Sequence, residues 1–330
     1  MNEERKTDAK AAEIAAMLRE RDNILVAAHA GPDGDAIGAT AAAGWLLHGL
    51  GKRFALYNMS GLPASYAWVR LPQPLISSLE ELSFTPELLV ALDCGEAQRL
   101  GPDLARLLET LPSINLDHHL ENPHFGSQGN WVDPDMAATG QMVAEVARAA
   151  GLPLSGGLAE GLCLSLVSDT GSFAFGNTSA GVFRLMAELL DKGLDFAGLR
   201  EQMDTQWSLA RSALWGRLLG KVESRFDGRL ILCAVRREDM DACGAATDDL
   251  EGFVELLRRH KGSKLAATIR EEAPDRCKLS ARSYGGGEAR ALAVRFGGGG
   301  HKNAAAATLH EPVDGALEKV IAAARDMFGA

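Results

Sequence analysis

The sequence has little of what a protein needs to coat nucleic acid. Aromatic residues make up 6% of the chain, and acidic residues outnumber basic ones, so the formal net charge is −10. A negative protein does not attract a polyanion over long distances, and few aromatic rings leave few platforms on which the bases of a strand can stack. We therefore expect no binding of a long duplex, although bound metals can still draw a phosphorylated ligand into a local pocket.

Signals for disulfides, secretion and membranes are missing as well. The five cysteines are scattered without a C-x-x-C pair, at Cys94, Cys163, Cys233, Cys243 and Cys277. An odd, scattered set indicates reduced thiols. The first residues, Met1 to Lys6, contain no apolar stretch, and no run reaches membrane-spanning length. We expect a cytoplasmic protein with no membrane partner.

A chain of 330 residues with 46% hydrophobic residues is long enough for two domains. The pattern changes near Gly216, where alternating apolar residues replace the alanine- and leucine-rich helices of the first half. The stretch from Asp195 to Trp215 is amphipathic and helical in pattern. We expect a first domain at residues 1–191, a helical connector at 192–215 and a second domain at 216–330.

Three apolar runs in the first half are each followed directly by acidic or histidine residues. The runs are Ile24–Ala28, Leu88–Leu92 and Ser113–Leu116. The residues that follow them are His29, Asp33 and Asp35, then Asp93, and then Asp117, His118 and His119. Continuous apolar runs that alternate with helices are typical of buried parallel strands. Their carboxyl ends share one edge of a doubly wound sheet, which is where ligands bind.

Imidazoles and carboxylates at one edge suit a divalent metal such as Mn²⁺, Zn²⁺ or Fe²⁺. Each group alone has an ordinary explanation. Asp-His-His at 117–119 is as often a polar turn, Asp35 resembles a helix cap, and Asp93 resembles the turn after a strand. Together the groups favour a metal site. Asp169 follows an apolar helix, Leu158 to Val167, and by itself would be a solvated boundary residue.

The second half contains a hairpin, a helix and a glycine run. Val222–Val235 alternates around an Asp-Gly turn signal, Leu250–His260 has a helical pattern, and Lys264–Arg270 and Arg276–Ser283 are typical of strands. Gly297–Gly300 is followed by His301, Lys302 and an alanine run that we expect to open a helix. No Gly-Lys-Ser/Thr is present, so this is not a P-loop. Uncovered backbone N–H groups suit a phosphate or ribose, and a flexible surface turn is the alternative.

Five motifs carry a resemblance to a known family. They are H-A-G-P-D-G-D-A-I-G, V-A-L-D-C-G, N-L-D-H-H, S-D-T-G-S-F and G-G-G-G-H-K-N-A-A. In this order they resemble the DHH–DHHA1 phosphoesterase family, and the match covers nearly the whole chain. The length is similar to the compact nanoRNase and 3′-phosphoadenosine-5′-phosphate (pAp) phosphatase branch. RecJ-type exonucleases are also similar, but they carry a further nucleic-acid-binding domain for which this chain has no room.

The resemblance implies a fold and a ligand set. The fold is an N-terminal doubly wound parallel-sheet DHH domain and a smaller C-terminal α/β DHHA1 domain with a mixed sheet, with the active site in the cleft between them. One metal would be held by His29, Asp33 and Asp93. A second would be held by Asp35, Asp93, His118 and Asp169, with Asp93 bridging. His119 would face the substrate phosphate, and Asp117 would orient an imidazole.

In the second domain the resemblance implies nucleotide binding through Ser280, Arg282, Gly298, Gly299, Gly300 and His301. Arg282 and His301 would also stabilise charge on the reacting phosphate. An alanine stands where many relatives have glycine at the end of the last motif, so this chain departs from the family pattern there. Arg99 also fits a family position, but a structural ion pair explains it equally well.

The resemblance implies a Mn²⁺-dependent phosphodiesterase and phosphatase with two divalent ions, Mg²⁺ ranking second because it prefers oxygen-only ligands. The expected substrates are short single-stranded RNA oligonucleotides and pAp-type nucleotides. A cyclic-di-AMP or pApA phosphodiesterase, an exopolyphosphatase and a non-catalytic nucleotide-binding regulator remain alternatives. A homodimer and the direction of attack on an oligonucleotide stay open.

Overall fold

The computed structural model describes residues 3–329, which divide between Thr205 and Gln206 into two compact units. We call them the first and the second unit. The division falls inside residues 192–215, which were predicted as one connector. Helix α7 (Phe196–Asp204) lies in the first unit and helix α8 (Leu209–Leu219) in the second, so the predicted continuous helical segment is interrupted. The domain boundaries 1–191 and 216–330 stay predictions.

The first unit is built around a six-stranded parallel sheet with the order β3-β2-β1-β4-β5-β6. The strands are β1 (Ile24–Ala28), β2 (Phe54–Tyr57), β3 (Leu75–Ile76), β4 (Leu88–Leu92), β5 (Ser113–Asp117) and β6 (Gly129–Val132). The order reverses between β1 and β4, which pair in parallel from Ile24 with Leu88 to Ala28 with Leu92. Such a reversal opens a crevice at the carboxyl ends of the two strands. The predicted doubly wound parallel sheet is confirmed.

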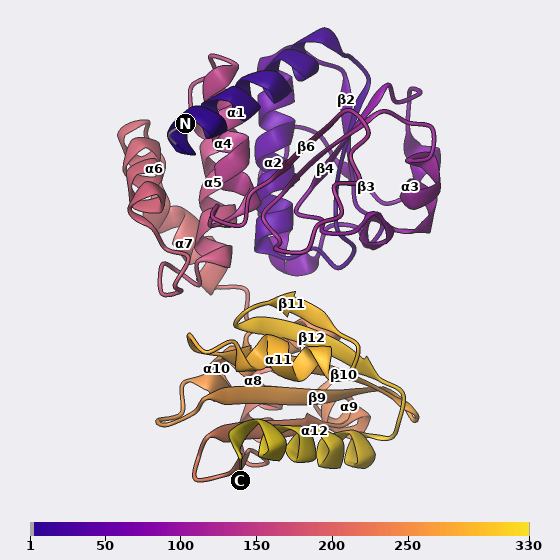
Figure 1. The fold of residues 1–330 in the computed structure, drawn as a ribbon, viewed down its shortest axis with the longest axis vertical. Coiled ribbons are helices and arrows are strands. Elements are labelled where there is room, and N and C mark those ends of the chain that lie inside the picture. Colours follow the sequence, from indigo (N-terminus) through magenta and orange to yellow (C-terminus); the bar gives the residue numbers. More distant parts are fainter. Residues whose placement is uncertain (1–2, 330) are drawn as a thin grey trace. The chain divides into compact units, whose positions relative to one another are not determined.

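Helices cover both faces of this sheet (Figure 1). The helices are α1 (Glu3–Glu20), α2 (Gly34–Gly49), α3 (Pro102–Leu107), α4 (Thr139–Ala149), α5 (Gly156–Asp169), α6 (Ala180–Asp191) and α7. Short 3₁₀ turns lie at Ala64–Tyr66, Leu79–Glu81 and Ala97–Leu100. The sheet has a hydrophobic core on each face, and the smaller one lies beside α3. Alternate residues of β1 point to opposite faces, so that Val26 belongs to the larger core and Leu25 to the smaller. Because both faces are buried, the strands are apolar throughout.

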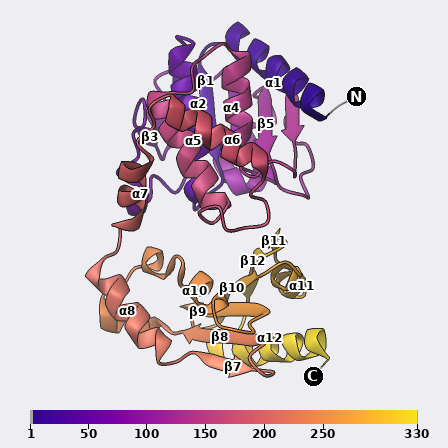
Figure 2. The same ribbon diagram turned by 90° about the vertical axis from the view of Figure 1, so that its left-hand side faces the viewer.

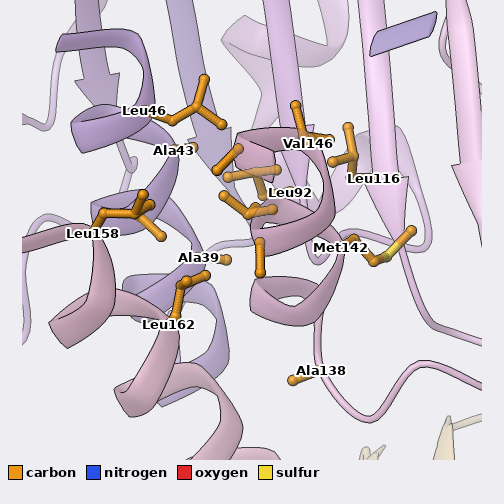
Figure 3. Packing of buried hydrophobic residues seen from close by; sticks show 14 of the residues in the cluster. Ala39, Ala43, Leu46, Leu92, Leu116, Ala138, Met142, Val146, Leu158 and Leu162 are labelled. Carbon is orange, nitrogen blue, oxygen red and sulfur yellow. The ribbon is translucent and has the colours of Figure 1, made fainter. Parts of the chain in front are cut away.

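The larger core joins α1, α2, α4 and α5 to the sheet and includes residues of α6 and α7. Figure 3 shows side chains of α2, α4 and α5, among them Leu46, Met142 and Leu162, around Leu92 and Leu116 of the sheet. Helices α2 and α5 approach closely through glycines. A Cβ on Gly38 would lie 2.5 Å from the backbone N of Ser165, so a larger residue there would force the helices apart. No helix among residues 3–329 is both long and apolar enough to cross a membrane.

The second unit contains a six-stranded mixed sheet with the order β11-β12-β10-β9-β8-β7. The strands are β7 (Glu223–Arg225), β8 (Leu230–Val235), β9 (Leu265–Ala273), β10 (Arg276–Ser283), β11 (Gly299–His301) and β12 (Ala304–Leu309). Only β8 and β9 pair in parallel. Helices α11 (Glu288–Val294) and α12 (Val313–Phe328) pack on one face, and α8, α9 (Arg237–Cys243) and α10 (Phe253–Arg258) on the other (Figure 2). A 3₁₀ turn spans Thr247–Leu250.

The predicted hairpin around Asp227 and Gly228 is confirmed as β7 and β8. The prediction of a helix after His301 is wrong, because Ala304–Leu309 forms strand β12, which pairs with β10 and β11. Alanine favours helices in isolation. Here Ala305 and Ala307 are buried in the core beneath the sheet, and pairing with two strands outweighs that local preference.

Candidate metal centre

The loop after β1 and the start of α2 place the first set of donors. His29 follows β1 directly, and the side chain of Asn58 fixes its backbone by donating from Nδ2 to the His29 carbonyl at 2.9 Å. Asp33 is the N-cap of α2: its Oδ1 accepts from the backbone N of Asp35 at 3.0 Å and of Ala36 at 3.1 Å. The helix cap considered for this motif therefore exists, but Asp33 forms it rather than Asp35.

Asp93 directly follows β4 and has a left-handed backbone, φ 50°, which an aspartate adopts more readily than most residues. Its carboxylate lies between two imidazoles. Oδ2 is 3.4 Å from Nε2 of His29, and Oδ1 is 3.6 Å from Nε2 of His118. His29, Asp33 and Asp93 form one group of converging donor atoms.

Asp35, His118 and Asp169 form a second group. Nε2 of His118 is 3.5 Å from Oδ2 of Asp35 and 3.2 Å from Oδ2 of Asp169, the last residue of α5. Asp35 is fully buried and is held by three donors. These are the backbone N of Thr139 at 2.8 Å, the backbone N of Gly140 at 3.3 Å and Oγ of Ser165 at 2.5 Å.

Asp117 and His119 form a hydrogen-bonded pair next to Asp93. Nδ1 of His119 lies 2.6 Å from Oδ1 of Asp117, and Nδ2 of Asn122 donates to Oδ2 of Asp117 at 2.7 Å. Burial opposes the charge of Asp117, but His119 and then Asn122 outweigh it and lower its pKa. Asp117 is thus a carboxylate that holds one edge of the His119 ring.

Without a metal, burial and mutual repulsion shift the pKa values of carboxylates in this centre. Burial, followed by repulsion from Asp93, raises the pKa of Asp35 to about 7, and burial together with Asp35 raises the pKa of Asp169 well above its usual range. Burial opposes the charge of His29, yet Asp93 and Asp33 raise its pKa to about 9. In the same way the pKa of His118 is raised, and the two imidazoles hold the pKa of Asp93 low despite its burial. Four carboxylates gathered in this way need positive charge beside them.

The imidazoles have the orientation that a metal ligand needs. Nδ1 of His29 is 3.0 Å from the carbonyl of Ala30, and Nδ1 of His118 is 3.2 Å from the carbonyl of Met136. A carbonyl can only accept, so each Nδ1 carries the proton and each Nε2 presents its lone pair to the carboxylates when the ring is neutral. Two imidazoles in this tautomer and four carboxylates fit divalent metal ions.

Sequence patterns did not reveal Asn58, Asn122 and Ser165, which position the donors. Ser165 precedes Asp169 by one turn of α5 and therefore shares its face, a spacing that could have indicated a supporting role. The side chain of Arg99 makes no ion pair or hydrogen bond within residues 3–329, so the structural ion pair considered for it is absent. Its positive charge opposes protonation of His29, which places it near the centre.

Four of the predicted substrate residues, Ser280, Arg282, Gly299 and His301, lie together on one face of the second unit. Because paired residues of neighbouring strands point to the same face, two rows can be followed across the sheet. Ser280, Ala306 and Gly299 form one row, and Arg282, Ala304 and His301 form the next. We call these six residues the small-residue face, since alanine and glycine make up its floor.

Arg282 is held at the edge of this face. Its Nε donates to Oε1 of Glu255 at 2.5 Å, and its Nη1 donates to the carbonyl of Ala281 at 3.0 Å. Nη2 makes no hydrogen bond to a residue that the structure describes. Gly298 and Gly300 are required by the fold, because a Cβ would lie 2.1 Å from the carbonyl of Ala306 or 2.6 Å from that of Ala304. At Gly299 a Cβ would meet nothing within 4 Å.

Known proteins match both units. The DHH family N-terminal domain matches residues 23–166, and the DHHA1 domain matches residues 232–330. The chain is 34% identical to a "Bifunctional oligoribonuclease and PAP phosphatase NrnA" of Thermus thermophilus, over 92% of this chain and 89% of that one. An exopolyphosphatase-related protein of Bacteroides fragilis has the same fold, with a TM-score of 0.87, 24% identity and 96% of each chain covered.

A structure of RecJ from Thermus thermophilus in complex with Mn²⁺ aligns at a TM-score of 0.51 and 16% identity, over 96% of this chain and 54% of RecJ. The parallel sheet, the gathered donors and the domain matches define a metal-dependent phosphoesterase. The chain belongs to the DHH–DHHA1 phosphoesterase family.

Proposed function

We propose that the protein hydrolyses short RNA oligonucleotides to mononucleotides and removes a phosphate from pAp. The observation that carries the proposal is the 34% identity, along 92% of the chain, to a relative named for both activities. The complete set of donors in the first unit supports turnover, because a regulator that only binds nucleotide has no need of six converging ligands.

We assign one divalent ion to His29, Asp33 and Asp93, and a second to Asp35, His118 and Asp169, with Asp93 shared. Sharing is supported by the two oxygens of Asp93, each of which faces a different imidazole. Mixed oxygen and nitrogen ligands favour Mn²⁺ over Mg²⁺. When bound, two such ions lower the pKa of water and neutralise charge that develops on a phosphate.

His119 is assigned to the phosphate. Its Nδ1 donates to Asp117, which fixes the plane of the ring, and we assign its Nε2 to a phosphate oxygen of the substrate. In hydrolysis a water oxygen bonds to phosphorus, the P–O bond to the leaving group breaks, and the leaving oxygen takes a proton. A ring that a carboxylate holds in one orientation can contact the phosphate throughout this step.

In the second unit we assign substrate binding to the small-residue face with Gly298 and Gly300. Nη2 of Arg282 is directed to a phosphate, and His301 to the same nucleotide. The two side chains lie two strands apart, about 10 Å by ordinary strand spacing, with only alanine between them in that row. That width fits a ribose and its phosphate.

The test of substrate is a length series. We expect kcat/KM for release of mononucleotides to be highest for RNA of about two to five residues and to fall on long RNA, because an acidic protein with few aromatic residues offers a long strand no further contacts. Cyclic dinucleotide and polyphosphate serve as competing substrates. Equal or rising efficiency with length would refute the proposal, and exclusive cleavage of polyphosphate would favour the exopolyphosphatase alternative.

Metal dependence separates an enzyme from a regulator. Chelation should abolish turnover, and Mn²⁺ should restore it better than Mg²⁺. Full activity in excess EDTA would contradict the assignment of metals. Nucleotide binding without any turnover in the presence of Mn²⁺ would favour the regulator.

A further inference from the structure

Tyr284 is an exposed aromatic residue directly after β10, with 53% of its surface accessible. The guanidinium carbon of Arg258 lies 4.1 Å from the centre of its ring. Arg258 itself is buried, and its Nη1 donates to the carbonyl of Ser283 at 3.3 Å. One face of the tyrosine ring is therefore covered by a cation that the protein fixes in place.

This arrangement is unusual for a residue that only fills space. Burying a guanidinium is costly unless hydrogen bonds and stacking compensate for lost hydration. A ring that served the core would be buried, whereas here the cation is buried and the ring is exposed. The contact restrains the ring without hiding it. An exposed, restrained aromatic face is what a stacking platform requires.

Helix α10 holds Tyr284 and Arg282 in the same way. Glu255, on the first turn of α10, pairs with Arg282, and Arg258, three residues later, lies under Tyr284. Tyr284 follows Arg282 by two residues, and side chains of α10 contact both. Tyr284 thus lies next to the small-residue face at the end of β10.

We propose that Tyr284 is a platform on which a nucleobase stacks while the phosphate of the same nucleotide contacts Arg282. This deepens the proposed function and rests on it for the nature of the substrate. Stacking on a ring face accepts any base, so the platform would bind nucleotides without strong preference for sequence. The phenolic oxygen makes no hydrogen bond to residues 3–329, and we assign the interaction to the exposed ring face.

The test compares Tyr284→Ala, Tyr284→Leu and Tyr284→Phe in the full chain with Mn²⁺. Calorimetric titration with adenosine 5′-monophosphate measures a ligand with a base, and titration with ribose 5-phosphate measures one without. Phe should keep the wild-type affinity for adenosine 5′-monophosphate. Ala and Leu should weaken it about tenfold while the affinity for ribose 5-phosphate is unchanged. Leu keeps an apolar contact with Arg258, so its result counts even if Ala perturbs folding.

Equal affinity of wild type, Ala and Leu for adenosine 5′-monophosphate would overturn the platform, and so would equal weakening of both ligands. The outcome is separable from that of the proposed function. If the wild type cleaves no oligonucleotide, the proposed function is refuted. If Tyr284→Ala nevertheless weakens binding of adenosine 5′-monophosphate and not of ribose 5-phosphate, the platform is supported. An active enzyme whose KM for a dinucleotide is unchanged in Tyr284→Leu would refute only the platform.

Discussion

The two units bring polar residues together by opposite means. In the first unit four of the six donors are buried: the accessible surface of His29, Asp35, Asp93 and His118 is between 0% and 6%, while Asp169 is half-buried and Asp33 is exposed. In the second unit the residues assigned to substrate lie on an open face of a sheet, where Gly299 and Gly300 are exposed and His301 is half-buried. Charges that are removed from water interact strongly and reorganise little, which suits chemistry. An open face suits the entry and release of nucleotides.

The difference extends to what holds each residue. Asp35 is fixed by Thr139, Gly140 and Ser165, which lie 104 to 130 residues away in sequence. The backbone of the small-residue face is fixed by strand register, with β10 paired to β12 and β12 to β11, and the side chain of Arg282 is held by Glu255 of α10. Changes in the first unit should therefore act on metal binding and turnover, and changes in the second on affinity for substrate.

The largest effect is expected from Asp93→Ala. Loss of a carboxylate that faces both imidazoles should lower kcat/KM by roughly 10³-fold, because it removes charge from both groups of donors. Kinetics and the number of Mn²⁺ ions per chain measure the effect. Asp103→Ala, an exposed carboxylate at the start of α3, is the control and should change neither. Normal metal content in Asp93→Ala would contradict a shared ligand.

Metal binding should depend strongly on pH. In the metal-free protein the pKa of His29 is about 9, so from neutral pH up to that value the ring holds a proton that a cation must displace. The affinity for Mn²⁺ should thus rise by at least about tenfold per pH unit and level off once both His29 and His118, whose pKa is also raised, have lost their protons. Below about pH 7 Asp35 also takes a proton, which steepens the slope. Titrations in buffers of different ionisation heat count the protons released, and a flat profile would contradict this sign.

A pair of glycine substitutions separates fold from binding in the second unit. Gly298→Ala should lower the free energy of unfolding by about 1–3 kcal/mol, because its methyl group overlaps the Ala306 carbonyl. Gly299→Ala should leave the melting temperature unchanged, yet raise KM for a dinucleotide about tenfold by standing where the nucleotide approaches. An unchanged KM in Gly299→Ala would mean that this glycine strand does not contact substrate.

The smallest effect is expected from Ser165→Ala. The hydroxyl donates to Oδ1 of Asp35 and accepts from the backbone N of Gly140 at 2.9 Å, so its loss frees the carboxylate to rotate. Affinity for Mn²⁺ should fall about tenfold, with nucleotide affinity unchanged. Ser168→Ala on the same helix is the control, since its hydroxyl makes no hydrogen bond within residues 3–329. Equal losses in both variants would indicate a general packing effect instead.

The sequence predicted the edge of the sheet well because local signals agreed there. β1, β4 and β5 are short apolar runs, and the polar residues that end them had to meet once the strands were parallel. Residues that act through distant contacts could not be found in this way. Asn58 is 29 residues from His29, and Ser165 is 130 residues from Asp35, so no short motif connects them. Ala304–Leu309 was misassigned because the helix preference of alanine is a local signal, whereas its pairing with β10 joins residues far apart in the sequence.

The glycine contacts between α2 and α5 have a consequence for how this protein tolerates sequence change over time. Asp35 is carried by α2 and Asp169 by α5, and these helices meet backbone to backbone, with Gly161 packed against Gly38 and Ala42. The spacing of the two carboxylates is therefore set by main-chain contact and not by the sizes of neighbouring side chains. Leucines and methionines elsewhere in the core can exchange for one another without altering the distance between the two carboxylates. A single methyl group at Gly38 or Gly161 would push the helices apart and increase that distance.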